Sequence, residues 1–136
     1  MFKGIASGEY ALAMTRRKRG DYLNALELAR AIVDALEDKK GEDILLIDIQ
    51  DIASFTDYFV ICTGTSGRML DALASSVQET IREHHKRKGR IEGQTTDGWM
   101  VVDFGDVVVH LFSPDQRGYY RLEELWQEGK VLVRVQ

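Results

Sequence analysis

Two apolar runs on either side of Gly105-Asp106 constrain the fold of this chain more than any other feature of its sequence. Trp99–Phe104 and Val107–Phe112 have the length and the β-branched and aromatic content of strands. A glycine followed by an aspartate suits a two-residue type II′ turn, because glycine readily takes the positive φ of the first turn position. The two runs are therefore predicted to form a β-hairpin, and the chain must contain a sheet.

The hairpin register predicts two unlike faces. One face is entirely apolar and is expected to pack on helices; it consists of Met100, Val102, Phe104, Val107, Val109 and Leu111. The opposite face mixes large apolar groups with an acid and an imidazole; it consists of Trp99, Val101, Asp103, Val108, His110 and Phe112. Two interpretations of the mixed face stay open. Either the last helix covers it, or it is a protein-binding patch, since interfaces concentrate aromatic side chains with a few charges.

The second interpretation identifies candidate partner-binding residues. Trp99, Val101 and Asp103 are then expected to stay partly exposed in the free protein. Tyr120 joins them, because helical spacing places Tyr119 on the buried side of the last helix and turns Tyr120 away from it. We expect these four side chains to form the surface that docks on a partner.

The rest of the chain predicts a single α/β domain from residue 21 to residue 136, with a mixed sheet and flanking helices. The length of 136 residues and the apolar content of 44% suit one compact unit with its own core. Asp21 is a candidate helix N-cap. Apolar spacing predicts helices near 22–38, 67–85 and 116–127, further strands near 44–49 and 58–62, and an edge strand at 131–135.

Charge divides the chain into two parts. Residues 1–20 carry five basic residues against one acidic residue, whereas the remainder has a formal net charge of −8 within the overall −4. The first segment is predicted to be a disordered basic tail, with contact to RNA or phosphate as the alternative. An acidic body argues against specific nucleic-acid binding and favours a basic partner. The single Cys62 and the absence of a long apolar run predict a cytoplasmic protein without a membrane segment.

The sequence offers little catalytic chemistry. Gly64–Gly67 lacks the lysine and the spacing of a phosphate-binding loop and is predicted to be a tight turn with a Ser or Thr cap. Asp48, Asp103 and Asp106 are more typical of surface and turn acids than of a metal site. Cys62 is expected to be inert packing, and His110 a contact residue or a packed imidazole. We therefore expect no catalytic residue, no metal and no cofactor.

Three segments of the chain resemble the signature blocks of the ribosomal silencing factor family, RsfS, also called Iojap. They are Asp57–Ser66, Trp99–Phe112 and Arg117–Trp126, in that order. The resemblance covers roughly residues 22–127. It implies a nucleotidyltransferase-like α/β domain without the catalytic acids, and a factor that is not an enzyme.

The resemblance also implies a partner and a mechanism. The family binds the large ribosomal subunit through its ribosomal protein fourteen, at the face where the small subunit docks, and hinders subunit joining and translation. Two rival functions stay open at this point. One is a nucleotidyl-transferring enzyme that uses Gly64–Gly67 and the three aspartates, and the other is a homodimeric adaptor that uses the aromatic patch for self-association.

Overall fold

The sheet that the hairpin requires is present and has six strands in the order β3-β4-β5-β2-β1-β6. A computed structural model describes residues 19–136, and for residues 19–23 it describes the helical backbone alone. The strands are β1 (Glu42–Asp48), β2 (Tyr58–Thr63), β3 (Arg90–Gln94), β4 (Trp99–Asp103), β5 (Val107–Phe112) and β6 (Lys130–Val135). The helices are α2 (Arg19–Asp38), α3 (Gly67–His85), α4 (Pro114–Tyr120) and α5 (Leu122–Leu125), with a 3₁₀ turn η1 (Thr95–Asp97).

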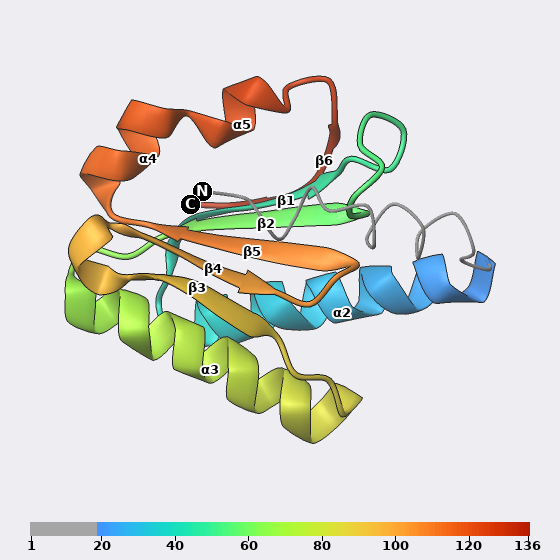
Figure 1. The fold of residues 1–136 in the computed structure, drawn as a ribbon, viewed down its shortest axis with the longest axis horizontal. Coiled ribbons are helices and arrows are strands. Elements are labelled where there is room, and N and C mark those ends of the chain that lie inside the picture. Colours follow the sequence, from blue (N-terminus) through green and yellow to red (C-terminus); the bar gives the residue numbers. More distant parts are fainter. Residues whose placement is uncertain (1–18) are drawn as a thin grey trace.

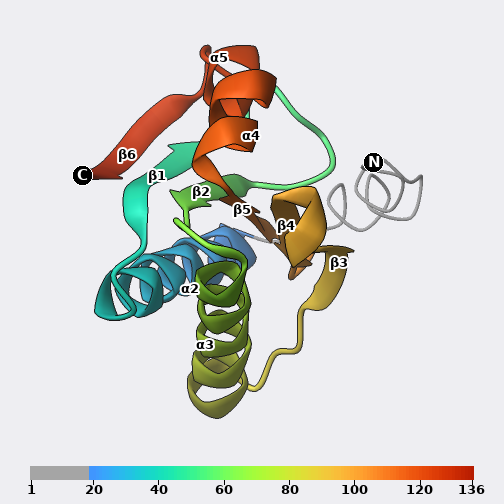
Figure 2. The same ribbon diagram turned by 90° about the vertical axis from the view of Figure 1, so that its left-hand side faces the viewer.

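The topology is mixed, and helices cover both faces of the sheet. β2 and β5 pair in parallel, and the other neighbouring strands pair antiparallel. Figure 1 shows α2 and α3 below the sheet and α4 and α5 above it, and Figure 2 shows the same layers from the side. The predicted α/β class with a single mixed sheet is confirmed. Within residues 19–136 no helix is long and apolar enough to cross a membrane.

The predicted hairpin is confirmed in register and in turn chemistry. Met100 lies opposite Leu111, and Val102 lies opposite Val109. Gly105 has a φ of 93°, and the Phe104 backbone N–H donates to the Val107 carbonyl at 2.9 Å. The turn therefore has the positive φ at its first position that the sequence predicts.

The apolar face of the hairpin packs on the two long helices, as expected. All six of its residues belong to one buried cluster with the inward residues of α2 and α3. The α3 stripe of Leu70, Leu73, Val77 and Ile81 is buried, and the Ser66 hydroxyl caps the helix by accepting from the Met69 backbone N–H at 3.1 Å. The predicted Ser cap at the Gly64–Gly67 turn is thus confirmed.

Three elements differ from the prediction by more than one or two residues at an end. α2 begins at Arg19, so Asp21 lies inside the helix and is not its N-cap. The expected helix at 116–127 is two short helices, because Arg121 takes a left-handed φ of 48°. β3 was not predicted, since its five residues are largely polar and exposed. Residues 1–18 of the predicted disordered tail lie outside the described residues. Arg19 and Gly20, which the prediction also assigned to the tail, belong to α2.

Candidate protein-docking surface

The mixed face of the hairpin is built around a stack of aromatic rings. The Trp99 ring centroid lies 4.7 Å from that of Phe112 and 4.4 Å from that of Tyr120 on α4. The Trp99 indole N–H donates to Nδ1 of His110 at 3.3 Å, and the His110 ring meets Phe59 edge-on at 4.7 Å. These contacts join β4, β5, β2 and α4 into one aromatic layer, which fixes the position of Tyr120.

The exposure predicted for three of the four docking residues is wrong. Trp99, Val101 and Asp103 retain exposed fractions of only 7%, 4% and 4%. Trp99 is covered by the Tyr120 ring, and Val101 belongs to the second buried cluster. Asp103 accepts from the Gly105 backbone N–H at 2.8 Å and pairs with Arg90 at 3.4 Å. The interpretation that the last helical segment covers this face is therefore the correct one for most of β4.

The aromatic residues of α4 reach the surface. Tyr120 is 38% exposed, which agrees with its predicted orientation. Tyr119 was expected to be buried, but it is 77% exposed and meets the Tyr120 ring edge-on at 5.0 Å. The left-handed residue Arg121 ends α4, so the helical spacing that would bury Tyr119 does not continue into α5. Leu125 on α5 is likewise 74% exposed.

A surface hollow opens beside the exposed Tyr120 ring. It has a volume of about 460 Å³ and lies between the β3–η1 segment and α4. Its lining consists of Gly93, Thr96, Asp97, Trp99, Gln116 and Tyr120, and we call it the Trp99–Tyr120 hollow. The remaining exposed edge of Trp99 faces this space. The hollow thus brings two of the four predicted docking residues together, with the exposed acid Asp97 on its lip.

Arg117 holds α4 in place, and no sequence pattern pointed to this residue. Its side chain donates to Oε1 of Glu123 at 3.0 Å and to the Thr63 hydroxyl at 2.9 Å. α4 also has Ser113 as a side-chain N-cap and Pro114 in its first turn. An arginine that joins α4, α5 and the end of β2 fixes the orientation of a short helix that has no buried residue of its own.

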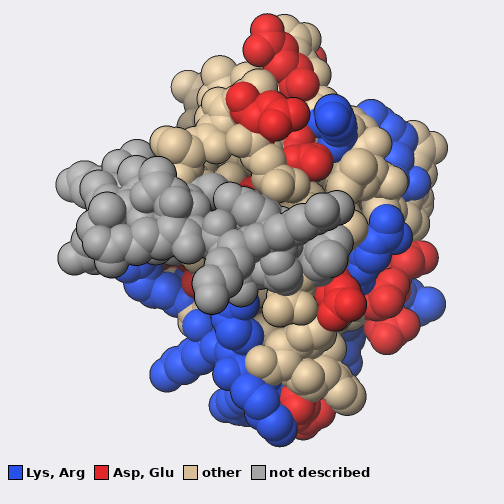
Figure 3. All heavy atoms as spheres, turned by 90° about the vertical axis from the view of Figure 1, so that its right-hand side faces the viewer, with Lys and Arg blue, Asp and Glu red and all other residues tan. Residues whose placement is uncertain are grey.

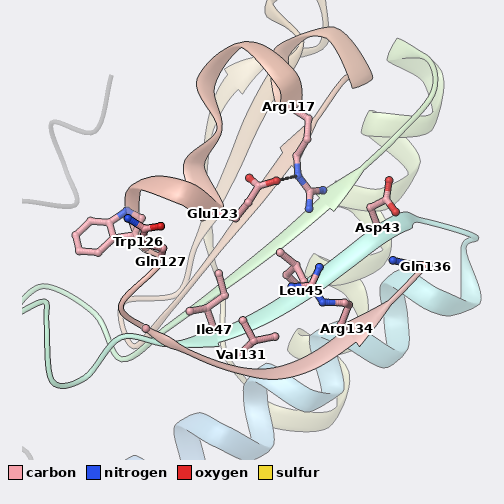
Figure 4. A pocket seen from close by; sticks show the side chains of 11 residues that line it. Asp43, Leu45, Ile47, Arg117, Glu123, Trp126, Gln127, Val131, Arg134 and Gln136 are labelled. Atoms are coloured by element: carbon pink, nitrogen blue, oxygen red, sulfur yellow. Dashed lines mark hydrogen bonds and ion pairs between the residues drawn. The ribbon is translucent and has the colours of Figure 1, made fainter.

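A second hollow lies on the same side of the sheet, between α4–α5 and β1–β6. Figure 4 shows Leu45, Ile47 and Val131 along its floor, with Arg117 bound to Glu123 at its wall. Its volume is about 400 Å³. The ion pair leaves this wall already neutralised, so the hollow presents no uncompensated charge from Arg117 to a ligand.

The buried nucleophile and base candidates are held in unreactive states. Burial lowers the pKa of His110 to about 3, so the imidazole is neutral at pH 7. Burial raises the pKa of Cys62 to about 12, so the thiol stays protonated. His110 therefore matches the predicted packed imidazole, and Cys62 matches the predicted buried thiol.

The three candidate metal-binding aspartates lie apart. β2 and β5 separate Asp48 on β1 from Asp103 on β4, which is three strand spacings or about 14 Å. Asp106 binds the Arg87 guanidinium through both carboxylate oxygens, at 2.9 and 3.1 Å. Asp103 and Asp106 are buried, so their description as surface acids is wrong, whereas their description as turn acids is confirmed by their positions at the β4–β5 turn. Within residues 19–136 no three His, Cys, Asp or Glu side chains are grouped to hold a metal ion.

Comparison with known proteins points to one family. A family profile described as "Ribosomal silencing factor during starvation" (RsfS) matches residues 22–136. The "Ribosomal silencing factor RsfS" of Bacillus subtilis is 38% identical over 107 residues, which are 79% of this chain and 91% of that protein. Mouse "Mitochondrial assembly of ribosomal large subunit protein 1" is 36% identical over 78% of this chain and 48% of its own length.

Solved structures agree with the sequence comparison. A crystal structure of protein CV0518 from Chromobacterium violaceum superimposes with a TM-score of 0.72 at 37% identity, over 79% of this chain and 92% of that one. Maize "Protein Iojap, chloroplastic" is a further relative, 33% identical over 78% of this chain and 46% of its own length. The profile match over most of the chain, the sequence identities and the shared fold lead to one conclusion: the chain belongs to the ribosomal silencing factor family, RsfS, which includes the Iojap proteins.

Proposed function

We propose that this protein represses translation in the cytoplasm by binding the large ribosomal subunit at the face where the small subunit docks. The proposed contact is ribosomal protein fourteen of the large subunit. Membership in the ribosomal silencing factor family supports a ribosomal role. Silencing then requires only affinity and placement, because a bound protein excludes the small subunit sterically. No bond is made or broken in this mechanism.

The observation that carries the proposal is the Trp99–Tyr120 hollow beside two exposed tyrosines. Tyr120 is held from beneath by Trp99, so it loses little side-chain freedom when a partner covers it. Hot spots of protein interfaces are enriched in Tyr, Trp and Arg and lie in well-packed pockets that become fully desolvated on binding. In this arrangement Tyr119 and Tyr120 contact the partner directly, and Trp99 forms the base of the pocket. Val101 and Asp103 are buried and hold β4 in place beneath the pocket.

The negative charge of this protein indicates that its partner is basic. Asp97 is exposed on the lip of the hollow, and the chain after residue 20 has a net charge of −8. A basic partner such as a ribosomal protein is attracted by this field, which raises the association rate most at low salt. Asp97→Lys is therefore expected to slow association and to weaken its dependence on salt.

The test is co-sedimentation of the purified full chain with isolated large subunits. Tyr120→Ala removes a half-exposed ring that packs on the buried Trp99 and Phe112 rings. It is expected to weaken binding by about 30-fold, a hot-spot loss of about 2 kcal/mol. Leu132→Ala is the matched control, because Leu132 is an exposed apolar residue on β6, away from the hollow. Circular dichroism shows whether each variant is folded.

The outcomes separate the rival functions. Folded Tyr120→Ala protein that co-sediments like the wild type contradicts this docking surface. Wild-type protein that does not bind large subunits contradicts the ribosomal function itself. A free protein that sediments as a dimer, and becomes a monomer in Tyr120→Ala, assigns the surface to self-association instead.

A further inference from the structure

The end of α3 and the segment after it form a dense positive patch on an acidic protein. Arg82 to Arg90 carry five basic residues against one acidic residue, and they hold five of the thirteen Lys and Arg that follow residue 20. Figure 3 shows Lys and Arg side chains gathered over the lower part of this end of the molecule, with acidic side chains mainly elsewhere. The net charge of the whole chain therefore conceals a local region of opposite sign.

Two of these arginines already have acidic partners. Arg87 binds Asp106 through two hydrogen bonds and also donates to the Phe104 carbonyl. Arg90 lies 3.4 Å from Asp103 and 3.2 Å from Glu92. These pairs neutralise buried carboxylates of the hairpin. Two of the five positive charges therefore have a structural role within the domain.

The other three cations have no acidic partner among the described residues. Arg82, Lys86 and Lys88 are exposed, and the Lys86 ammonium contacts the Glu83 backbone carbonyl at 3.1 Å. Favourable interaction with the helix dipole accounts for cations in the last turn, but it falls off within that turn. Lys88 lies beyond the left-handed C-cap residue Lys86, so the dipole does not explain it. We call Arg82, Lys86 and Lys88 the basic tip.

The basic tip lies beside the beginning of α2. A small hollow between the two helices is lined by Asn24 and Glu27 of α2 and by His85 and Arg87 near the end of α3. Figure 1 shows the start of α2, the end of α3 and the β4–β5 turn at the same end of the molecule. In the sequence, Arg16–Lys18 directly precede the first residue of α2.

The β3 edge strand connects the basic tip to the docking surface. Arg90 pairs with Asp103 at one end of β3, and Gln94 pairs with Trp99 at the other. Four residues of strand, about 13 Å, therefore separate Arg90, the last residue of the basic segment, from the strand pair at Trp99. A protein seated at the hollow and a polyanion beside it can be bound at the same time.

We propose that the basic tip binds the phosphate backbone of RNA, beside the protein partner of the docking surface. This proposal extends the proposed function, since a large ribosomal subunit presents RNA next to its basic proteins. Three cations without acidic partners match a small number of phosphate contacts, which position a protein on RNA without reading its sequence. Outside residues 1–20 and 82–90 the chain is acidic, which disfavours RNA binding through the rest of the domain.

The test compares two triple variants of the full chain with the same net charge. Arg82→Gln/Lys86→Gln/Lys88→Gln removes the basic tip. Lys39→Gln/Lys40→Gln/Arg68→Gln removes three exposed cations near the opposite ends of α2 and α3. The probe is a fluorescent RNA hairpin of about 20 base pairs, and its anisotropy is measured from 25 to 150 mM KCl. The tail sequence is unchanged in both variants.

The tip variant is expected to bind the hairpin at least tenfold more weakly at the lowest salt. It is also expected to reduce the slope of log affinity against log salt by about 2–3, at roughly 0.7–0.9 per lost phosphate contact. The control variant should keep the wild-type slope. Equal losses in both variants, or an unchanged slope in the tip variant, overturn the proposal.

Two further arms separate this proposal from the proposed function. Tyr120→Ala should bind the RNA hairpin like the wild type while it loses affinity for large subunits. A tip variant that loses affinity for large subunits but binds the hairpin normally would assign the tip to an acidic protein and overturn the RNA proposal. Failure of the wild type to bind subunits would contradict the ribosomal function and leave the hairpin result to decide on the tip.

Discussion

The two faces of the sheet are covered by unlike layers. The face toward α2 and α3 is mainly aliphatic and is covered by helices of 20 and 19 residues. The face toward α4 and α5 is rich in aromatic rings and is covered by helices of seven and four residues, with the segment around Phe55. The long helices bury their inward apolar stripes, whereas the short pair leaves Tyr119, Tyr120 and Leu125 exposed. The first face therefore supplies stability, and the second carries the surface that we propose for a partner.

The largest effect on stability is expected on the face that α2 and α3 cover. Leu73 on α3 is fully buried, and Leu73→Ala should lower the free energy of unfolding by about 2–5 kcal/mol, through lost burial and the cavity left behind. Urea denaturation measures this loss. A loss below 1 kcal/mol would show that this face is not tightly packed.

Low pH is expected to destabilise the protein through His110, which is buried in the aromatic face. Burial lowers the pKa of His110 to about 3, so the unfolded chain binds a proton near pH 6.5 that the folded protein excludes. Stability is then lost as the pH falls below about 6.5 and continues to fall toward 3, amounting to about 2 kcal/mol between pH 7 and pH 5. Urea denaturation at both pH values should show that His110→Asn removes this dependence and that the exposed control His84→Gln keeps it. Identical pH dependence in the two variants would contradict a neutral buried His110.

A smaller loss of stability is expected when a buried leucine of the short helices is truncated to alanine. Leu122 is the buried residue of α5, and Leu122→Ala should cost about 1–2 kcal/mol, because a four-residue helix can move to fill part of the cavity. Urea denaturation alongside Leu73→Ala tests this directly. Equal losses in the two variants would mean that the two covering layers are equally rigid.

The smallest effect on stability is expected at the exposed ring. Tyr119→Ala should change the free energy of unfolding by less than about 0.5 kcal/mol, because the side chain is mostly in solvent. The same variant should still bind large subunits more weakly in co-sedimentation. A variant that unfolds readily would place Tyr119 in the structural layer and remove it from the docking surface.

The comparison also explains what the sequence could predict. Strict alternation and a Gly-Asp turn specify the β4–β5 register, and a regular apolar stripe specifies α3 with its Ser66 cap. Neither rule applies to α4 and α5, since no glycine or proline marks the left-handed turn at Arg121. The sequence therefore predicted the outward orientation of Tyr120 correctly but placed Tyr119 on the wrong side.

The burial of the remaining candidates depends on contacts between distant segments. Trp99 and Val101 lie on a face whose cover comes from residues beyond position 112, and Asp103 is bound by Arg90 on a strand with no apolar pattern. Alternation alone shows which residues share a face. It does not show how fully a later, irregular segment covers them.

The most direct test of the account is site-specific photocrosslinking to isolated large subunits. A photoreactive phenylalanine analogue replaces Tyr119 beside the Trp99–Tyr120 hollow or, as the control, Leu132 on β6, and crosslinked proteins are identified by mass spectrometry. The account predicts that position 119 crosslinks one basic protein of the large subunit, ribosomal protein fourteen, and that position 132 does not. Crosslinks to that protein from position 132 alone, or from neither position while the protein still co-sediments, would contradict docking through this surface.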